Sequence, residues 1–133
     1  MFDFANLLSA NPNGVLASRS GEAVKTRVFQ CLFSQGQKVF FCTSREKEVY
    51  KQLAADQNIS FCAYPSDFSP VVSISGKTVF SEDPALKARA LNENPMIKEI
   101  YKSPDNPIFV LFYLEVEEVK TFSFADGTKT YRL

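Results

Sequence analysis

The sequence contains no histidine and no tryptophan, and only three of its 133 residues are cysteine. Without histidine, the chain has no Ser-His-Asp triad, no histidine metal ligand and no histidine general base. Fifteen basic residues balance fifteen acidic ones, so no charge excess favours nucleic acid or an anionic membrane. No apolar run approaches the ~20 residues that cross a bilayer. We therefore expect no metal site, no nucleic-acid partner and no membrane partner.

The three cysteines are widely spaced within apolar stretches and form no CxxC pair; they are Cys31, Cys42 and Cys62. This pattern favours a reducing, cytoplasmic location, with each thiol acting as a small core residue. A thiol nucleophile is the less frequent alternative. The first thirteen residues lack a basic segment and predict a short helix at 2–8, not a signal peptide.

Thirteen Phe and five Tyr among 45% apolar residues indicate a β-rich globular chain, and the length fits one domain, 1–133. Strands are predicted at 15–18, 23–33, 38–42, 59–64, 71–80, 108–116, 119–124 and 129–132, and helices at 2–8, 46–55, 85–91 and 95–101. Gly76, inside a strand, predicts a bulge or barrel bend. The pattern favours an α+β, mainly β domain whose antiparallel sheet closes into a barrel.

One strand–turn–helix segment has the composition of an anion site. Arg27 interrupts an apolar strand, Thr43 and Ser44 stand where a strand meets a helix, and Lys47 is expected in the first helical turn. A helix N-terminus attracts anions, and a cation placed there is unfavourable unless an anion is bound.

A purely structural interpretation of the same residues is also open. Thr43 followed by Glu46 fits a capping box, Lys47 is then simply solvated, and Arg27 pairs with Glu22 or Glu46. On spacing alone, capping is the commoner role.

Several segments, in order and at their spacing, resemble small pyridoxamine 5'-phosphate oxidase-like flavoproteins from about Asn13 to Phe124. They are Gly14-Val-Leu-Ala, Thr26-Arg-Val-Phe-Gln, Phe40-Phe-Cys-Thr-Ser with Lys47, Val49-Tyr-Lys-Gln-Leu, Ile74-Ser-Gly-Lys, Ser103-Pro-Asp-Asn-Pro-Ile-Phe and Phe112-Tyr-Leu.

The resemblance implies a six-stranded antiparallel split β-barrel with a few short helices, working as a homodimer with FMN at the subunit interface. It assigns the FMN phosphate to Arg27, Lys47, Thr43 and Ser44, and it places Val28, Phe29 and Gln30 beside the isoalloxazine ring. It further implies that residues 103–112 of the second subunit help to complete the pocket.

The chain also departs from the family's namesake enzymes. They hold substrate with His, Arg and Trp near the C-terminus, and they place a polar residue where Val71 stands. We therefore expect an FMN-dependent oxidoreductase that does not oxidise pyridoxamine phosphate, with no catalytic residue assigned. Alternatives are a non-enzymatic flavin carrier, sensor or electron-transfer module, F420 in place of FMN, and a scaffold without cofactor. Heme is disfavoured without histidine, although Cys or Tyr ligands stay open.

Overall fold

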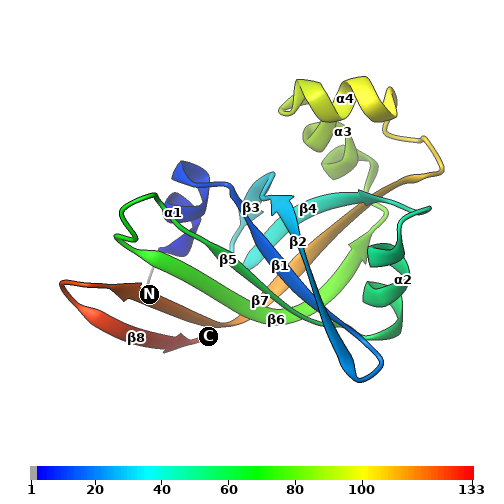
Figure 1. Cartoon of the computed structure of the whole chain (residues 1–133). Helices are drawn as coiled ribbons and strands as arrows, with labels where there is room; N and C mark the ends of the chain where they lie inside the picture. Colours follow the sequence, from blue (N-terminus) through cyan, green and yellow to red (C-terminus); the bar gives the residue numbers. More distant parts are fainter. Residues whose placement is uncertain (1–2) are drawn as a thin grey trace.

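The computed structural model describes residues 3–133, and its eight strands form one antiparallel sheet that curls on itself (Figure 1). The strands are β1 Asn13–Ser20, β2 Ala23–Gln30, β3 Phe33–Gln35, β4 Lys38–Ser44, β5 Asn58–Ala63, β6 Val71–Ser81, β7 Phe109–Ser123 and β8 Gly127–Arg132. Their order is β2-β1-β5-β6-β7-β4-β3, with β8 paired to β7. The mainly antiparallel α+β fold is thus confirmed, but the predicted six-stranded barrel is wrong in its strand count.

The two ends of this strand path, β2 and β3, are consecutive in the sequence. Only Cys31 and Leu32 separate them, and the N–H groups of these residues donate to Pro12 O (2.7 Å) and Phe40 O (2.8 Å). These bonds turn the chain away from β2, so the single strand predicted at 23–33 is wrong and β3 forms separately. The sheet is therefore split beside β2.

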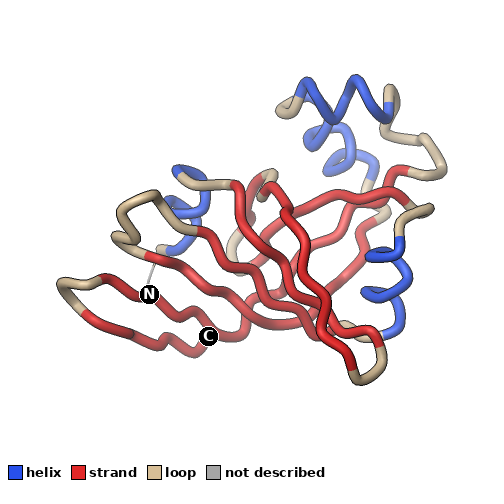
Figure 2. The backbone as a smooth tube through the Cα atoms, viewed as in Figure 1, coloured by secondary structure: helices blue, strands red, loops and turns tan. Residues whose placement is uncertain are grey.

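Within residues 3–133, four short helices lie at the margins of the sheet (Figure 2). They are α1 Phe4–Ala10, α2 Glu48–Ala55, α3 Pro84–Asn92 and α4 Pro95–Tyr101. The predicted N-terminal helix is found at α1, while residue 2 lies outside the described residues. Helices α3 and α4 stand together beyond one end of the sheet, with α2 below them (Figure 1). Within residues 3–133, no helix is long and apolar enough to cross a membrane.

Strand β7 runs unbroken where two strands were predicted, because a bulge absorbs the change of register. Ser75 pairs with Glu118 and Gly76 with Val116, which leaves Glu117 as the extra residue. A Cβ at Gly76 would overlap the carbonyl oxygen of Glu115. The predicted irregularity at Gly76 is confirmed, and the close approach of the two backbones explains why glycine stands there.

Burial separates the strands into two kinds. Strands β4 and β7 contain consecutive residues that are buried on both faces of the sheet, such as 39–41 and 109–112. On one face, Phe41 and Phe112 point into the barrel core. On the other, Phe40 packs in a second cluster with residues of α3 and α4. Strands β1, β5 and β6 bury alternate residues only. Their outer face is left without a covering layer among the described residues.

Candidate functional site

A cavity of about 250 Å³ lies where the sheet is split, between β2, the end of β4 and helix α4. Six of the seven residues predicted to bind a cofactor line it: Arg27, Val28, Phe29, Gln30, Thr43 and Lys47. The fold therefore brings together residues from two strands that share no ladder within the described chain. The seventh, Ser44, follows Thr43 on β4 but is outside the lining.

Arg27 points from β2 towards α2 and makes two hydrogen bonds to neutral side chains. Its Nη1 donates to Ser18 Oγ (2.7 Å) and its Nη2 to Gln52 Oε1 (2.6 Å). Partial burial lowers the pKa of Arg27, but a guanidinium stays charged at any physiological pH. The alternative pairing with Glu22 or Glu46 is wrong, since no ion pair of Arg27 is present among residues 3–133.

The junction between β4 and α2 differs from the predicted capping box. The helix begins at Glu48, with Lys47 as its N-cap and no side-chain cap bond. Lys47 therefore stands one position before the predicted first turn, with its side chain exposed. The chain makes turns at Arg45 and Glu46, and this displaces the helix start and separates Thr43 from the helix.

Thr43 is 3% exposed, and its hydroxyl has no hydrogen-bond partner within the described chain. A buried hydroxyl without a partner costs about 1–3 kcal/mol relative to a satisfied one. Ser44 differs, because its Oγ accepts from the N–H of Glu46 (3.2 Å). An oxygen that accepts can still donate its own proton, so both hydroxyls retain a free O–H.

Strand β2 borders the cavity with an unpaired edge. It pairs with β1 on one side, Val28 with Val15 and Gln30 with Asn13, and among residues 3–133 it has no partner on the other. Alternate residues of such an edge direct their N–H and C=O groups away from the paired strand. Phe29 turns its ring inward, at 6.0 Å and 5.8 Å from the ring centroids of Phe41 and Phe112.

The sequence analysis missed the remaining lining residues, of which three belong to α4: Leu32, Cys42, Val49, Ile97, Ile100 and Tyr101. Helix α4 lies about seventy residues from β2 in the sequence, so only the fold reveals this wall. The i, i+3 and i+4 spacing of its three residues predicts one helical face, but does not indicate what that face covers.

Cys42 and Tyr101, which also line the cavity, stay neutral. Burial raises the pKa of Cys42 to about 12, and nearby Lys47 offsets this rise only in part. Burial, followed by the neighbouring Cys42, raises the pKa of Tyr101. Burial also raises the pKa of Cys31, to about 11, and that of Cys62. A protonated thiol is a poor nucleophile, which argues against thiolate chemistry here.

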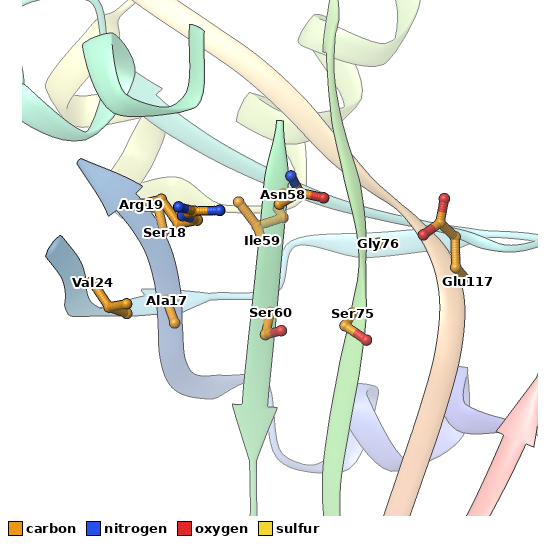
Figure 3. Close-up of a pocket in the computed structure, with 10 residues that line it drawn as sticks. All are labelled: Ala17, Ser18, Arg19, Val24, Asn58, Ile59, Ser60, Ser75, Gly76 and Glu117. Atoms are coloured by element: carbon orange, nitrogen blue, oxygen red, sulfur yellow. The ribbon is translucent and has the colours of Figure 1, made fainter. Parts of the chain in front are cut away.

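A second hollow, of about 370 Å³, lies on the uncovered outer face of the sheet (Figure 3). Its floor is made of small uncharged residues on adjacent strands, Ala17, Ser60, Ser75 and Gly76, with Arg19 and Glu117 at opposite ends. It holds none of the predicted cofactor ligands and lacks the pair of cations.

The sequence of the chain matches one known protein family. The family described as pyridoxamine 5'-phosphate oxidase matches residues 3–123. The chain belongs to this family. The family expected from the sequence is therefore confirmed. No curated protein matches the chain.

Solved structures of the same fold differ in what they bind. A NimC/NimA family protein from Clostridium acetobutylicum is 22% identical, with a TM-score of 0.85 over 96% of this chain and 88% of that one. A heme binding protein from Mycobacterium smegmatis is 21% identical, with a TM-score of 0.76 over 96% and 56%. A FAD-binding protein from Mesorhizobium loti is 13% identical, with a TM-score of 0.71 over 87% and 88%. At such identities the likeness establishes the fold and does not select a cofactor.

Proposed function

We propose that this chain is an FMN-binding flavoprotein that acts as an oxidoreductase. The observation that carries the proposal is the pairing of two cations, Arg27 and Lys47, with the unpartnered buried hydroxyl of Thr43 around one cavity. No carboxylate lines this cavity within residues 3–133. Such a site is complementary to a doubly charged phosphate, which needs cations and free donors.

The residues present fit the FMN phosphate. Lys47 supplies a positive charge on a flexible stem, and Arg27 presents a fork of N–H donors. Thr43 gains the hydrogen bond that it lacks, whereas Ser44, the fourth predicted phosphate ligand, lies outside the lining of this cavity. Without an anion, two uncompensated cations around one small cavity repel each other.

The polar edge of the isoalloxazine ring fits the open edge of β2. A flavin ring carries alternating donors and acceptors, and the free N–H and C=O groups along Val28–Gln30 match this pattern. These backbone groups hold the same positions whatever the side chains, so the binding requires no particular residue there.

One copy of the chain encloses too little space for the whole cofactor. Ligand sites usually measure about 300–1,000 Å³ and bury most of the ligand, whereas this cavity measures about 250 Å³. We propose that a second copy completes the site in a homodimer, as a twofold pair. In support, Val24 and Val28 share one face of β2 and are 67% and 74% exposed. Val28 lines this cavity, and Val24 borders the small-residue hollow of Figure 3, which can receive the same ridge of a second copy.

Bound FMN supplies hydride or electron transfer, and the chain binds and orients it. Cys42 and Tyr101 remain protonated and uncharged at the cavity wall. With no histidine in the sequence, the base used by many redox enzymes is absent. The same observation favours a second candidate, a flavin carrier or electron-transfer module on the same site. Steady oxidation of NAD(P)H by the FMN-loaded protein would decide for the enzyme.

The decisive experiment is an absorption spectrum of the purified protein with mass spectrometry of whatever co-purifies. We expect a flavin spectrum and the mass of FMN. The mass also separates FMN from FAD and F420, and a Soret band would identify heme. A colourless protein that shows no thermal shift with added FMN would contradict the proposal.

A further inference from the structure

The guanidinium of Arg27 is held by a closed triangle of hydrogen bonds. Besides the two bonds from Arg27, Ser18 Oγ donates to the same Gln52 Oε1 atom at 2.9 Å. Ser18 is 2% exposed on β1, and Gln52 lies on α2. The bonds join three elements, β1, β2 and α2, and fix the direction of the arginine fork.

The anchoring side chains are neutral, although carboxylates occur nearby on the sequence. Residue 56, just after α2, is an aspartate, but it pairs with Arg19 at 3.7 Å. A carboxylate at position 52 would accept the same two hydrogen bonds and would also neutralise Arg27. The glutamine satisfies the fork by hydrogen bonding alone, so the positive charge remains uncompensated.

The arginine also keeps most of its donors. A guanidinium has five N–H groups in a plane, and Ser18 and Gln52 occupy two of them. Three remain, and Arg27 lines the cavity that contains Lys47. A planar fork that is already oriented loses less entropy when an oxyanion binds.

We propose that Ser18 and Gln52 are positioning residues that seat Arg27 without neutralising it, so that its full charge and its remaining donors serve the phosphate of the cofactor. The inference rests on the proposed function, because it specifies how the phosphate end of that site is prepared. It assigns a role to two residues that do not line the cavity themselves.

The test is Gln52→Glu, which keeps both acceptor positions and adds one negative charge. We expect FMN to bind about 10–100-fold more weakly, as expected for loss of a charge-assisted contact of about 1.5–3 kcal/mol. Riboflavin lacks the phosphate and should bind wild type and variant equally. The thermal midpoint should stay level or rise, because the new carboxylate pairs with Arg27. A residue with only a structural role would not separate FMN from riboflavin.

Gln35→Glu is the matched control, because Gln35 is exposed on β3 and outside the cavity lining; it should leave both affinities unchanged. Gln52→Met, which removes the acceptor without adding charge, should weaken FMN about 3–10-fold through the freed fork. Equal FMN affinity of wild type and Gln52→Glu would overturn the inference.

Failure of the proposed function gives a different result. Wild type would then bind neither FMN nor riboflavin, and inorganic phosphate becomes the probe. A phosphate-dependent rise in the thermal midpoint of wild type that is lost in Gln52→Glu would still support the positioning of Arg27 by Ser18 and Gln52. Equal response of the two proteins to phosphate would overturn it.

Discussion

Replacing Thr43 by valine should change stability and cofactor affinity in opposite directions. Valine has nearly the same shape as threonine, so the substitution removes one hydroxyl and leaves no cavity. That hydroxyl is buried and unpartnered, and burying it costs about 1–3 kcal/mol. The protein without cofactor should gain this free energy of unfolding, which corresponds to roughly 4 °C per kcal/mol for 133 residues.

The same change should weaken FMN binding about 10–100-fold, because a hydrogen bond to a charged phosphate is lost. Affinity is measured by titrating the protein with FMN and following flavin fluorescence, and stability by thermal and denaturant unfolding without FMN. Riboflavin should bind Thr43→Val and wild type equally.

The chain offers a matched control at Thr78. Its hydroxyl is also buried and unpartnered within the described residues, but it lies on β6 outside the cavity lining. Thr78→Val should stabilise the protein by a similar amount and leave FMN affinity unchanged. The reasoning is refuted if Thr43→Val binds FMN as tightly as wild type, or if Thr78→Val weakens FMN equally.

Three further predictions follow from the same structure. Lys47→Ala should weaken FMN binding by about 1–3 kcal/mol and reduce the salt dependence of that binding. The stability of the protein should stay unchanged, because this side chain is exposed. A salt dependence equal to that of wild type would contradict the role of Lys47. Gly76→Ala should destabilise the fold by about 3 kcal/mol or more, because the new methyl group meets the β7 backbone at Glu115. Denaturant unfolding measures this loss. A loss under about 1 kcal/mol would show that the backbone of β7 shifts to make room for the methyl group. The pKa of the Cys42 thiol is raised from 9.0 to about 12 in the folded protein. Above pH 9 the thiol of the unfolded chain therefore loses its proton while the folded one keeps it. The free energy of unfolding should fall over this range by up to about 1.4 kcal/mol per pH unit for this thiol. Cys42→Ala should make this slope shallower and leave the part that the buried thiol of Cys31 contributes; a slope identical to that of wild type would contradict the burial of the Cys42 thiol.

Much of the local structure follows from the order of residues along the chain. Strands β5 and β6 lie within one residue of the ranges predicted for them, 59–64 and 71–80. The apolar run that predicted a strand at 108–116 lies almost entirely in β7. The start of α2 was predicted two residues too early, because Thr43 and Glu46 fit a capping pattern and no local signal shows that the intervening residues form a turn. The break after Gln30 was missed for a similar reason, since the bonds that turn the chain come from Pro12 and Phe40.

The sequence by itself determined the family, the mainly antiparallel fold and the candidate anion ligands, because these depend on residue type, spacing and order. Only the tertiary structure decided which of those candidate residues line one cavity, and that α4 supplies the far wall of this cavity. It also decided that the buried hydroxyl of Thr43 lacks a hydrogen-bond partner within the described residues. It also decided that Ser18 and Gln52, and not a carboxylate, hold Arg27. Contacts between elements depend on how strands pair and where the sheet is split, and these are set by packing across the whole chain.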